Sequence, residues 1–452
     1  MKTYKKIKII ALILFVTIII FASFFGVYKK EDFRAVNIIK NYKLGMQFTN
    51  KVEFKGIPTQ DEKEIIYDKD GNIVENDGET SYSEENGYTV TTEKINNAEV
   101  LNEANYKLTK KILKDRLKGM GVGEYKLNSN NETGEISVVL QENEEVHEIE
   151  EFLLQKGNFL ITDKETGEVL LDNSQVQSTK VVYGPSQQDQ SATVVYLQID
   201  FNKEGTKKLE EISQIYVATE NEEKTEEENA KYVSVVLDAE TLSSTYFGEK
   251  MSTGVLYIPI TQATDSETLA NYVKQVNNIA TVINEGELPI EYNFEEEIVE
   301  STFDKDKLII LITSFATVFI VELVLITIKF KSKGFIAAFM QIGYIALLLL
   351  VLRYTNVIIT IQGIIGIGVS AILNFTFNFV MLNSLKNKEK MDWKVVEKFA
   401  LWTISIYVLA IILSFNSLTV VSSLGMTLVW GSICLYLFNL SLTKTALEML
   451  SK

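Results

Sequence analysis

The stretch IIALILFVTIIIFASFFGV, from Ile9 to Val27, runs for 19 residues without a charged side chain. An α-helix of this length crosses the ~30 Å hydrocarbon core of a bilayer. Four lysines precede it, as they would precede either a membrane anchor or a cleaved signal peptide (Lys2, Lys5, Lys6 and Lys8). The run is long for a signal peptide, and no small-residue cleavage site followed by a polar segment is evident. We therefore expect an uncleaved transmembrane helix.

Five further apolar runs of spanning length lie near the other end of the sequence. Lysines flank them on alternate sides, so the positive-inside rule places both termini in the cytoplasm. The sequence thus predicts an α-helical membrane bundle of six transmembrane helices, one plus five, and a large extracytoplasmic domain. The expected domains are residues 1–28, 29–306 and 307–452. The five runs are Leu308–Ile328, Phe335–Leu352, Ile358–Leu382, Phe399–Phe415 and Leu418–Leu440.

The charges divide along the same boundaries. The chain carries 60 acidic and 44 basic side chains, a net charge of −16. Residues 31–306 hold 55 acids and 26 bases, whereas the remainder holds 5 acids and 18 bases. A domain with this excess of acids repels phosphate backbones, so we expect no nucleic-acid partner.

Several kinds of chemistry are disfavoured by composition. A single Cys (Cys434) cannot form an intrachain disulfide. With a single His (His147), the chain has too few His and Cys ligands for a His/Cys zinc site. We find no phosphate-binding loop, nucleophile elbow or metal-ligand spacing. The sequence therefore predicts no cofactor, no metal and no enzymatic activity, and the external domain is interpreted as a binding or mechanical module.

The external segment alternates strand and helix patterns, with a βαββαβ-like order in its first half. This order predicts a ferredoxin-like α+β domain with antiparallel sheet. Asp70–Gly71 is a strong hairpin turn signal, and the acidic run Glu220–Asn229 is interpreted as a solvated loop. The expected helices are Asn97–Lys118, Val146–Gln155, Lys203–Tyr216 and Ser266–Ile283. The expected strands include Lys43–Phe54, Glu124–Asn128, Ile136–Leu140, Asn158–Thr162, Thr179–Tyr183, Thr193–Phe201, Tyr232–Leu237, Val255–Ile260 and Pro289–Glu297.

Polar residues inside the spans are the candidate functional residues. Small and amide side chains recur at steps of three or four from residue 363 to residue 378, which places them on one helix face. Such a stripe indicates close helix packing, with a proton or ion path as the alternative. Thr376 lies off the stripe and is a further proton-path candidate with Asn374, Asn378 and Glu322, because a hydroxyl can pass a proton along a hydrogen-bonded chain. The alternative is that it bonds the carbonyl one turn back. Gln341 and Asn439 are further packing candidates. The stripe consists of Gly363, Gly366, Ser370, Asn374 and Asn378.

Five short stretches, in this order and spacing, are similar to motifs of SecD, a membrane subunit that assists the Sec export channel. SecD chains have one helix, a large external domain and five more helices. The resemblance implies an accessory subunit of the Sec translocon that assists export of unfolded polypeptides across the plasma membrane. The stretches are Arg116–Glu124 (RLKGMGVGE), Phe201–Gly205 (FNKEG), Val235–Asp238 (VVLD), Glu285–Ile290 (EGELPI) and Gly363–Ile367 (GIIGI).

The resemblance also implies partners, and it leaves alternatives open. SecD works with a second six-helix half, so the chain is expected to bind a SecF-like subunit, the Sec channel, unfolded secretory polypeptides and membrane lipids. One alternative is a divergent paralogue that acts as a scaffold or holdase without proton coupling. Another is a transporter of the resistance–nodulation–division group that moves a small molecule or lipid.

Two departures from the SecD pattern bear on mechanism. The first external motif of the family is Gly-Leu-Asp-Leu-x-Gly-Gly, and here it is Gly45–Lys51 (GMQFTNK). The family's intramembrane Val-Asp-Ala-Asn is here Phe375–Asn378 (FTFN), so Thr376 replaces the carboxylate. Glu322 is the acid placed well inside a predicted span, where such a residue is a functional candidate. We hypothesise that Glu322 supplies the titratable group that Thr376 lacks; the competing interpretation is a purely structural, protonated or snorkelling carboxyl.

Overall fold

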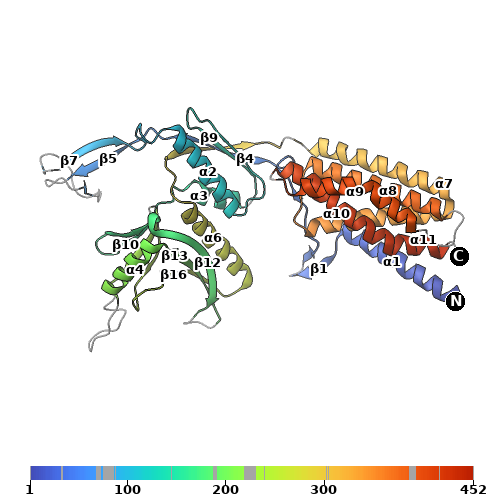
Figure 1. Cartoon of the computed structure of the whole chain (residues 1–452), viewed down its shortest axis with the longest axis horizontal. Coiled ribbons are helices and arrows are strands. Elements are labelled where there is room, and N and C mark those ends of the chain that lie inside the picture. The colour runs from blue at the N-terminus through green and yellow to red at the C-terminus, as the bar shows by residue number, and fades with distance from the viewer. Residues whose placement is uncertain are drawn as a thin grey trace. The chain divides into compact units, whose positions relative to one another are not determined.

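The computed structural model divides into two compact units (Figure 1). One contains residues 1–51 and 299–452, and the other contains residues 52–298. Residues 29–51 and 299–306, assigned to the external domain from sequence, thus group with the helices. The structure describes all residues except 1, 32–33, 68–72, 75–85, 87, 144, 187–190, 218–230, 239, 302, 304, 386–392, 417 and 451–452.

The first unit is a helical bundle. Five of its helices are long and apolar enough to cross a membrane. Two short sheets accompany them: the hairpin β1 (Tyr28–Glu31) with β2 (Arg34–Asn37), and the parallel pair β3 (Lys43–Leu44) with β18 (Ile358–Ile359). The helices are α1 (Lys2–Phe25), α7 (Lys305–Tyr354), α8 (Ile361–Ser384), α9 (Trp393–Ser414), α10 (Thr419–Phe438), the π-helical turn η3 (Asn439–Thr443) and α11 (Lys444–Leu450).

Helix α7 reverses direction within its length. Its apolar part contains 49 residues, which would extend far beyond a bilayer if it were straight. Lys331 has non-helical backbone angles (φ 51°, ψ −125°), and Gly334 lies against the backbone of Ile326. Residues eight apart in a straight helix are separated by about 12 Å. The two parts of α7 therefore form a tight helical hairpin, and a side chain at Gly334 would overlap the Ile326 carbonyl.

The segment Gly45–Lys51, which departs from the first external motif of SecD, forms a turn. A single strand was expected over Lys43–Phe54. Phe48 N–H donates to the Gly45 carbonyl at 3.0 Å, and the Gln47 side chain accepts from Ile361 N–H, at the start of α8, at 3.0 Å. A second strand, β4 (Lys51–Pro58), begins after this turn. The motif therefore holds the α8 N-terminus, which needs acceptors for its free N–H groups.

The second unit is an α+β domain built on four sheets. Their orders are β17-β4-β9-β8, β11-β10-β14-β15, β12-β13-β16 and β6-β5-β7. Further strands are β5 (Glu62–Tyr67), β6 (Ile73–Val74), β7 (Thr89–Lys94), β8 (Lys126–Ser129), β9 (Ile136–Gln141), β10 (Phe159–Asp163), β11 (Val169–Asp172), β12 (Val176–Pro185), β13 (Thr193–Phe201), β14 (Val233–Leu237), β15 (Glu240–Thr245), β16 (Val255–Ala263) and β17 (Tyr292–Val299). The helices are α2 (Glu103–Gly119), α3 (Val146–Leu154), the 3₁₀ turn η2 (Asn173–Gln175), α4 (Lys203–Ile215) and α6 (Ser266–Glu285).

The predicted βαββαβ run does not close on one sheet. Its last strand, β10, pairs with β11 and β14 instead, and the later strand β17 occupies the edge beside β4. β5 and β6 pair as a hairpin whose turn, Asp70–Gly71, lies outside the described residues, as does Glu220–Asn229. The ferredoxin-like assignment thus stays a prediction, whereas the α+β composition is observed.

Helix α2 shows how local sequence sets an element's bounds. It begins six residues later than expected, because the Asn97 side chain accepts from Val100 N–H at 2.9 Å in a turn and Asn102 caps the helix by accepting from Asn105 N–H at 2.9 Å. Its buried side chains form one stripe that faces the core. These are Tyr106, Thr109, Ile112, Leu113, Arg116 and Leu117.

Arg116 joins α2 to the ends of two other helices. Its side chain is 0% exposed. It donates to the carbonyls of Leu153 (3.0 Å) and Lys156 (3.1 Å) at the end of α3, and to that of Gly286 (2.8 Å) after α6. Helix C-termini carry partial negative charge and free carbonyls. A cationic donor there stabilises the charge and hydrogen-bonds to the carbonyls.

A second acceptor completes this junction. Asp238, in the left-handed region (φ 56°), accepts from the N–H groups of Gly157 (2.9 Å) and Asn158 (2.7 Å). Burial lowers the pKa of Arg116 to about 10, and the charges of Asp238 and Glu285 act in the opposite direction, so the guanidinium stays charged at neutral pH. Three stretches that resemble SecD motifs (residues 116–124, 235–238 and 285–290) therefore meet at one point.

We predict that Arg116→Met destabilises the α+β unit by about 3 kcal/mol, because buried carbonyls lose their donor. Hydrogen exchange of the full chain, followed peptide by peptide, measures this loss in α2 and α3. Trp fluorescence would not, because Trp393, Trp402 and Trp430 all lie in bundle helices.

The matched control is Lys118→Met on the same helix. Lys118 is exposed and pairs with Asp115 (3.1 Å) at the surface, so the expected change is under about 0.5 kcal/mol. Equal exchange rates in the two variants would contradict a structural role for Arg116.

Candidate functional site

Four buried amide side chains gather inside the helical bundle. Gln341 comes from α7, Asn374 and Asn378 from α8, and Asn439 from the turn η3. Each is at most 1% exposed. Residues 374 and 378 are one turn apart on α8, which aims both side chains at the same neighbour.

These amides form a hydrogen-bond network centred on Gln341. Gln341 Oε1 accepts from Asn378 Nδ2 at 2.9 Å and from Asn374 Nδ2, and Gln341 Nε2 donates to the Ala371 carbonyl at 3.0 Å. Asn439 Nδ2 donates to Asn374 Oδ1. Amides do not ionise, so the network joins three elements and orients hydrogen bonds but takes up no charge.

The turn that carries Asn439 interrupts an otherwise continuous helix. Residues 439–443 form a π-helical turn between α10 and α11. Such single turns are uncommon and are frequent at functional sites. Sequence analysis named Asn439 as a packing candidate, but no sequence signal indicated the change in helical winding.

The small residues of α8 face α10. A side chain at Gly363 would meet Ser423, and one at Gly366 would meet Thr427. Ser370, which is 2% exposed, lies in turn against Gly431 of α10. Small residues at such positions let two membrane helices approach closely.

Thr376 stands apart from the amide network. It is half-buried, and its hydroxyl donates to the Ile372 carbonyl one turn back at 2.9 Å. The position that carries a carboxylate in the SecD pattern is thus occupied here by a side chain that bonds its own helix.

Glu322 lies in a groove of about 690 Å³ between the first part of α7 and α8. Its side chain is 8% exposed, and its Oε2 atom is buried without a hydrogen-bond partner among the described residues. From α7 the groove is lined by Leu308, Ile312, Phe315, Ala316, Val318, Phe319 and Glu322 of the first part and by Ile345 and Leu349 of the second part. From α8 it is lined by Ile364, Ile367, Gly368, Ala371 and Ile372.

The groove and the amide network share one residue. Ala371 lines the groove, and its carbonyl accepts from Gln341 of the network. Glu322 itself makes no hydrogen bond to Asn374 or Asn378 among the described contacts. The structure thus brings the carboxylate beside α8, the helix that carries two of the amides, and leaves it outside their network.

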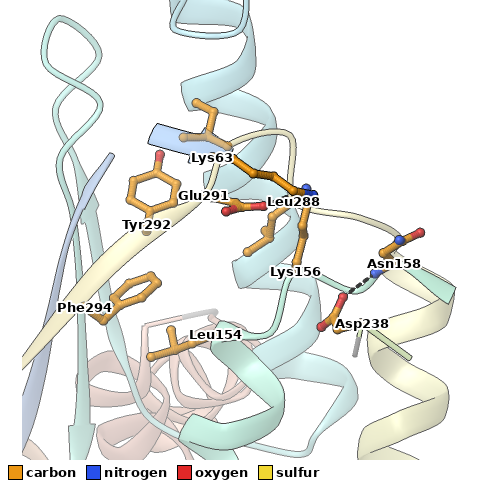
Figure 2. Close-up of a pocket in the computed structure, with 10 residues that line it drawn as sticks. Lys63, Leu154, Lys156, Asn158, Asp238, Leu288, Glu291, Tyr292 and Phe294 are labelled. Atoms are coloured by element: carbon orange, nitrogen blue, oxygen red, sulfur yellow. Dashed lines mark hydrogen bonds and ion pairs between the residues drawn. The ribbon is translucent and has the colours of Figure 1, made fainter. Parts of the chain in front are cut away.

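The α+β unit contains a second cavity, of about 540 Å³ (Figure 2). Figure 2 shows Tyr292 and Phe294 of β17 on one side and Asn158 and Asp238 of the Arg116 junction on the other. The wall is mixed in character, since Leu288 and Ile290 also line it. Sequence analysis singled out no residue here.

Charged side chains form ion pairs at this cavity. Lys156 Nζ lies 2.8 Å from Glu291 and 3.4 Å from Glu287. Burial opposes the charge on Lys156, but the two glutamates together raise its pKa. An apolar wall beside a bridged cation and anions suits an extended chain with both apolar and polar side chains.

His147 has acidic neighbours at the surface. Its ring and the carboxylates of Glu150 and Glu296 place ligand-type atoms within 4.8 Å of one another, and His147 and Glu296 are exposed. His147 Nδ1 lies 3.3 Å from Glu150, which is an ordinary surface contact one helical turn away. The expectation that the chain holds no metal stays a prediction.

A bundle of apolar helices long enough to cross a bilayer, together with an α+β unit, indicates a membrane protein. Comparison with solved structures specifies the fold: it is that of SecDF. The crystal structure of SecDF in its super-membrane-facing form has a TM-score of 0.59 and 15% identity. That match covers 100% of this chain and 58% of the SecDF chain, so the chain spans less than two thirds of that protein.

A second SecDF crystal structure, described as a translocon-associated membrane protein from Thermus thermophilus, matches with a TM-score of 0.45 and 15% identity. It covers 99% of this chain and 59% of that one. No protein-family model matches the sequence, and no curated protein matches it significantly. The SecD-like resemblance seen in the short motifs thus agrees with the fold.

We predict that Asn374→Leu lowers the stability of the bundle by about 1–3 kcal/mol, because Gln341 and Asn439 both lose a partner where no water replaces it. Thermal unfolding of the detergent-solubilised chain, read by Trp fluorescence, measures the change. Thr376→Val is the control two positions away. It removes only a bond within one helix, and we expect a shift of under about 0.5 kcal/mol. A larger loss for Thr376→Val than for Asn374→Leu would contradict the assignment of the network.

Proposed function

We propose that this protein is an accessory subunit associated with the Sec translocon, which assists export of unfolded polypeptides across the plasma membrane. The observation that carries the proposal is the SecDF-like fold of the entire chain. In this proposal the bundle crosses the membrane six times, with α7 as a hairpin of two crossings. Both termini are then cytoplasmic and residues 52–298 lie outside.

The external cavity supports a role in holding a polypeptide. Its wall combines apolar side chains with a bridged Lys156, and unfolded chains present both kinds of surface. Two of the stretches that resemble SecD motifs lie beside this cavity. Asp238 lines it and accepts from Asn158 N–H, and Arg116 donates to the carbonyl of Gly286, in the same stretch as Leu288 of the lining. We propose that this domain holds an emerging chain and hinders its return.

The SecD resemblance bears on partners. We propose that a SecF-like helical half works together with this chain, which spans about 58% of the SecDF structure that it resembles. Contact with the Sec channel would place the α+β unit at the exit of the exported chain.

The composition of the amide network favours a second candidate, a holdase without proton coupling. The network contains Gln341, Asn374, Asn378 and Asn439 and no group that titrates, and Thr376 is not part of it. In the proton-driven version, the Glu322 carboxyl in the adjoining groove is the group that gains and loses a proton. The two versions differ in their dependence on this single carboxyl.

Deletion of the gene should slow the export of secretory precursors and leave the accumulation of small lipophilic compounds unchanged. Pulse-chase conversion of a precursor and a dye-accumulation assay in the same strain separate these outcomes. A transporter of the resistance–nodulation–division type would give the opposite pair of results. Recovery of neither a SecF-like protein nor channel subunits from mild detergent would also count against the proposal.

Glu322→Gln should abolish the part of export that an uncoupler removes, because glutamine cannot bind or release a proton. Precursor export with and without uncoupler measures this difference. Glu397→Gln, the same substitution at an exposed position on α9, should export normally. Full uncoupler-sensitive export by Glu322→Gln would exclude the carboxyl from coupling, and uncoupler-insensitive export by the unaltered protein would favour the holdase.

A further inference from the structure

The groove at Glu322 has features of a ligand site that helix packing does not explain. Helices that pack without a ligand fill the space between them with side chains. Here a cavity of about 690 Å³ persists, within the range of small-molecule sites. Its lining is almost entirely aliphatic and aromatic, and Glu322 is the one charged residue among the lining residues described.

The carboxylate lies at one end of this cavity. Helical rise places Glu322 about 21 Å from Leu308, the first α7 residue of the lining. Phe24 near the end of α1, and Leu44 and Phe48 after it, also line the groove. Along α7 the lining is therefore apolar over about 21 Å, and its single acidic group, Glu322, lies at one end.

The Glu322 carboxyl favours one chemical class of ligand. A buried carboxyl oxygen without a partner costs free energy, and a donor that reaches it recovers the loss. A cationic donor forms a charge-assisted bond, which is stronger than a neutral one. The remaining lining offers dispersion contacts to a linear or aromatic hydrocarbon.

We infer that the bundle binds a lipophilic amine in this groove, with the nitrogen against the Glu322 carboxylate and the hydrocarbon body along α7 and α8. Complementary charge favours this occupant over a lipid acyl chain, which would leave Oε2 without a partner. The site does not depend on the proposed role in export, since it rests on the cavity and on the buried carboxyl alone.

The occupied groove would act on the bundle in a defined way. Phe315 packs on Gly368 across the groove, and Ala371 connects the groove to the amide network. An amine that bridges Glu322 to this wall would hold α7 against α8. It would also remove the free carboxyl from any proton exchange.

The test uses the full chain in nanodiscs of phosphatidylcholine and three probes that share one tail: N,N-dimethyldodecylamine, dodecanol and dodecanoate. Binding is followed by Trp fluorescence and by the shift in unfolding temperature. We expect saturable binding of the amine, at least about tenfold tighter than that of the alcohol, and no saturable binding of the anion.

Three variants assign the site. Glu322→Gln should reduce amine affinity to that of dodecanol, and Ala316→Phe should weaken both probes because it fills the groove while the carboxyl remains. Glu397→Gln should leave both affinities unchanged. Equal binding of amine and alcohol, with no effect of Glu322→Gln, would overturn the proposal and identify a groove for lipid chains. Undiminished amine binding by Ala316→Phe would likewise overturn it.

Discussion

Hydrocarbon offers no hydrogen bonds, and this constraint organises the helical unit. Every amide side chain placed between apolar helices must find its partner within the protein. Gln341, Asn374, Asn378 and Asn439 bond to one another, although Asn378 Oδ1 and Asn439 Oδ1 have no hydrogen-bond partner among the described residues. Their positions on α7, α8 and η3 therefore fix how these three elements face one another, and the glycines of α8 permit the close approach to α10 that the network needs.

The same need for hydrogen-bond partners applies in the α+β unit, where the buried side chain carries a charge. Arg116 is fully buried, yet its neighbours are carbonyls at the ends of α3 and α6, which have no partner within their own helices. One side chain satisfies two helix ends and fixes the loop that leads to β10. Gly157 is required at this loop, because a side chain there would overlap the Arg116 guanidinium.

Much of this arrangement could be predicted from residue order. Apolar runs gave the helices, and caps and periodicity gave most strand and helix bounds, such as β13 at the predicted Thr193–Phe201. Long-range pairing could not be predicted: nothing local distinguishes β10 from β17 as the strand beside β4. The reversal at Lys331 was implied by two adjacent apolar runs, but no local signal indicated the π-helical turn that carries Asn439, whose side chain bonds Asn374 of another helix.

Glu322 is a buried carboxyl in the same unit, and one of its oxygens has no hydrogen-bond partner among the described residues. The stripe of α8 could be read from sequence, and so could the presence of one acid within a span, but not whether the two would meet. Ala371 lines the groove that contains Glu322, and its carbonyl accepts from Gln341 of the amide network. Glu322 Oε2 has no hydrogen-bond partner among the described residues, and neither do Asn378 Oδ1 and Asn439 Oδ1 of the network; of these three groups only the Glu322 carboxyl lines the groove, and only it can carry a charge. A proton would remove that charge and a bound cationic donor would pair with it, and both would act on the contact between α7 and α8.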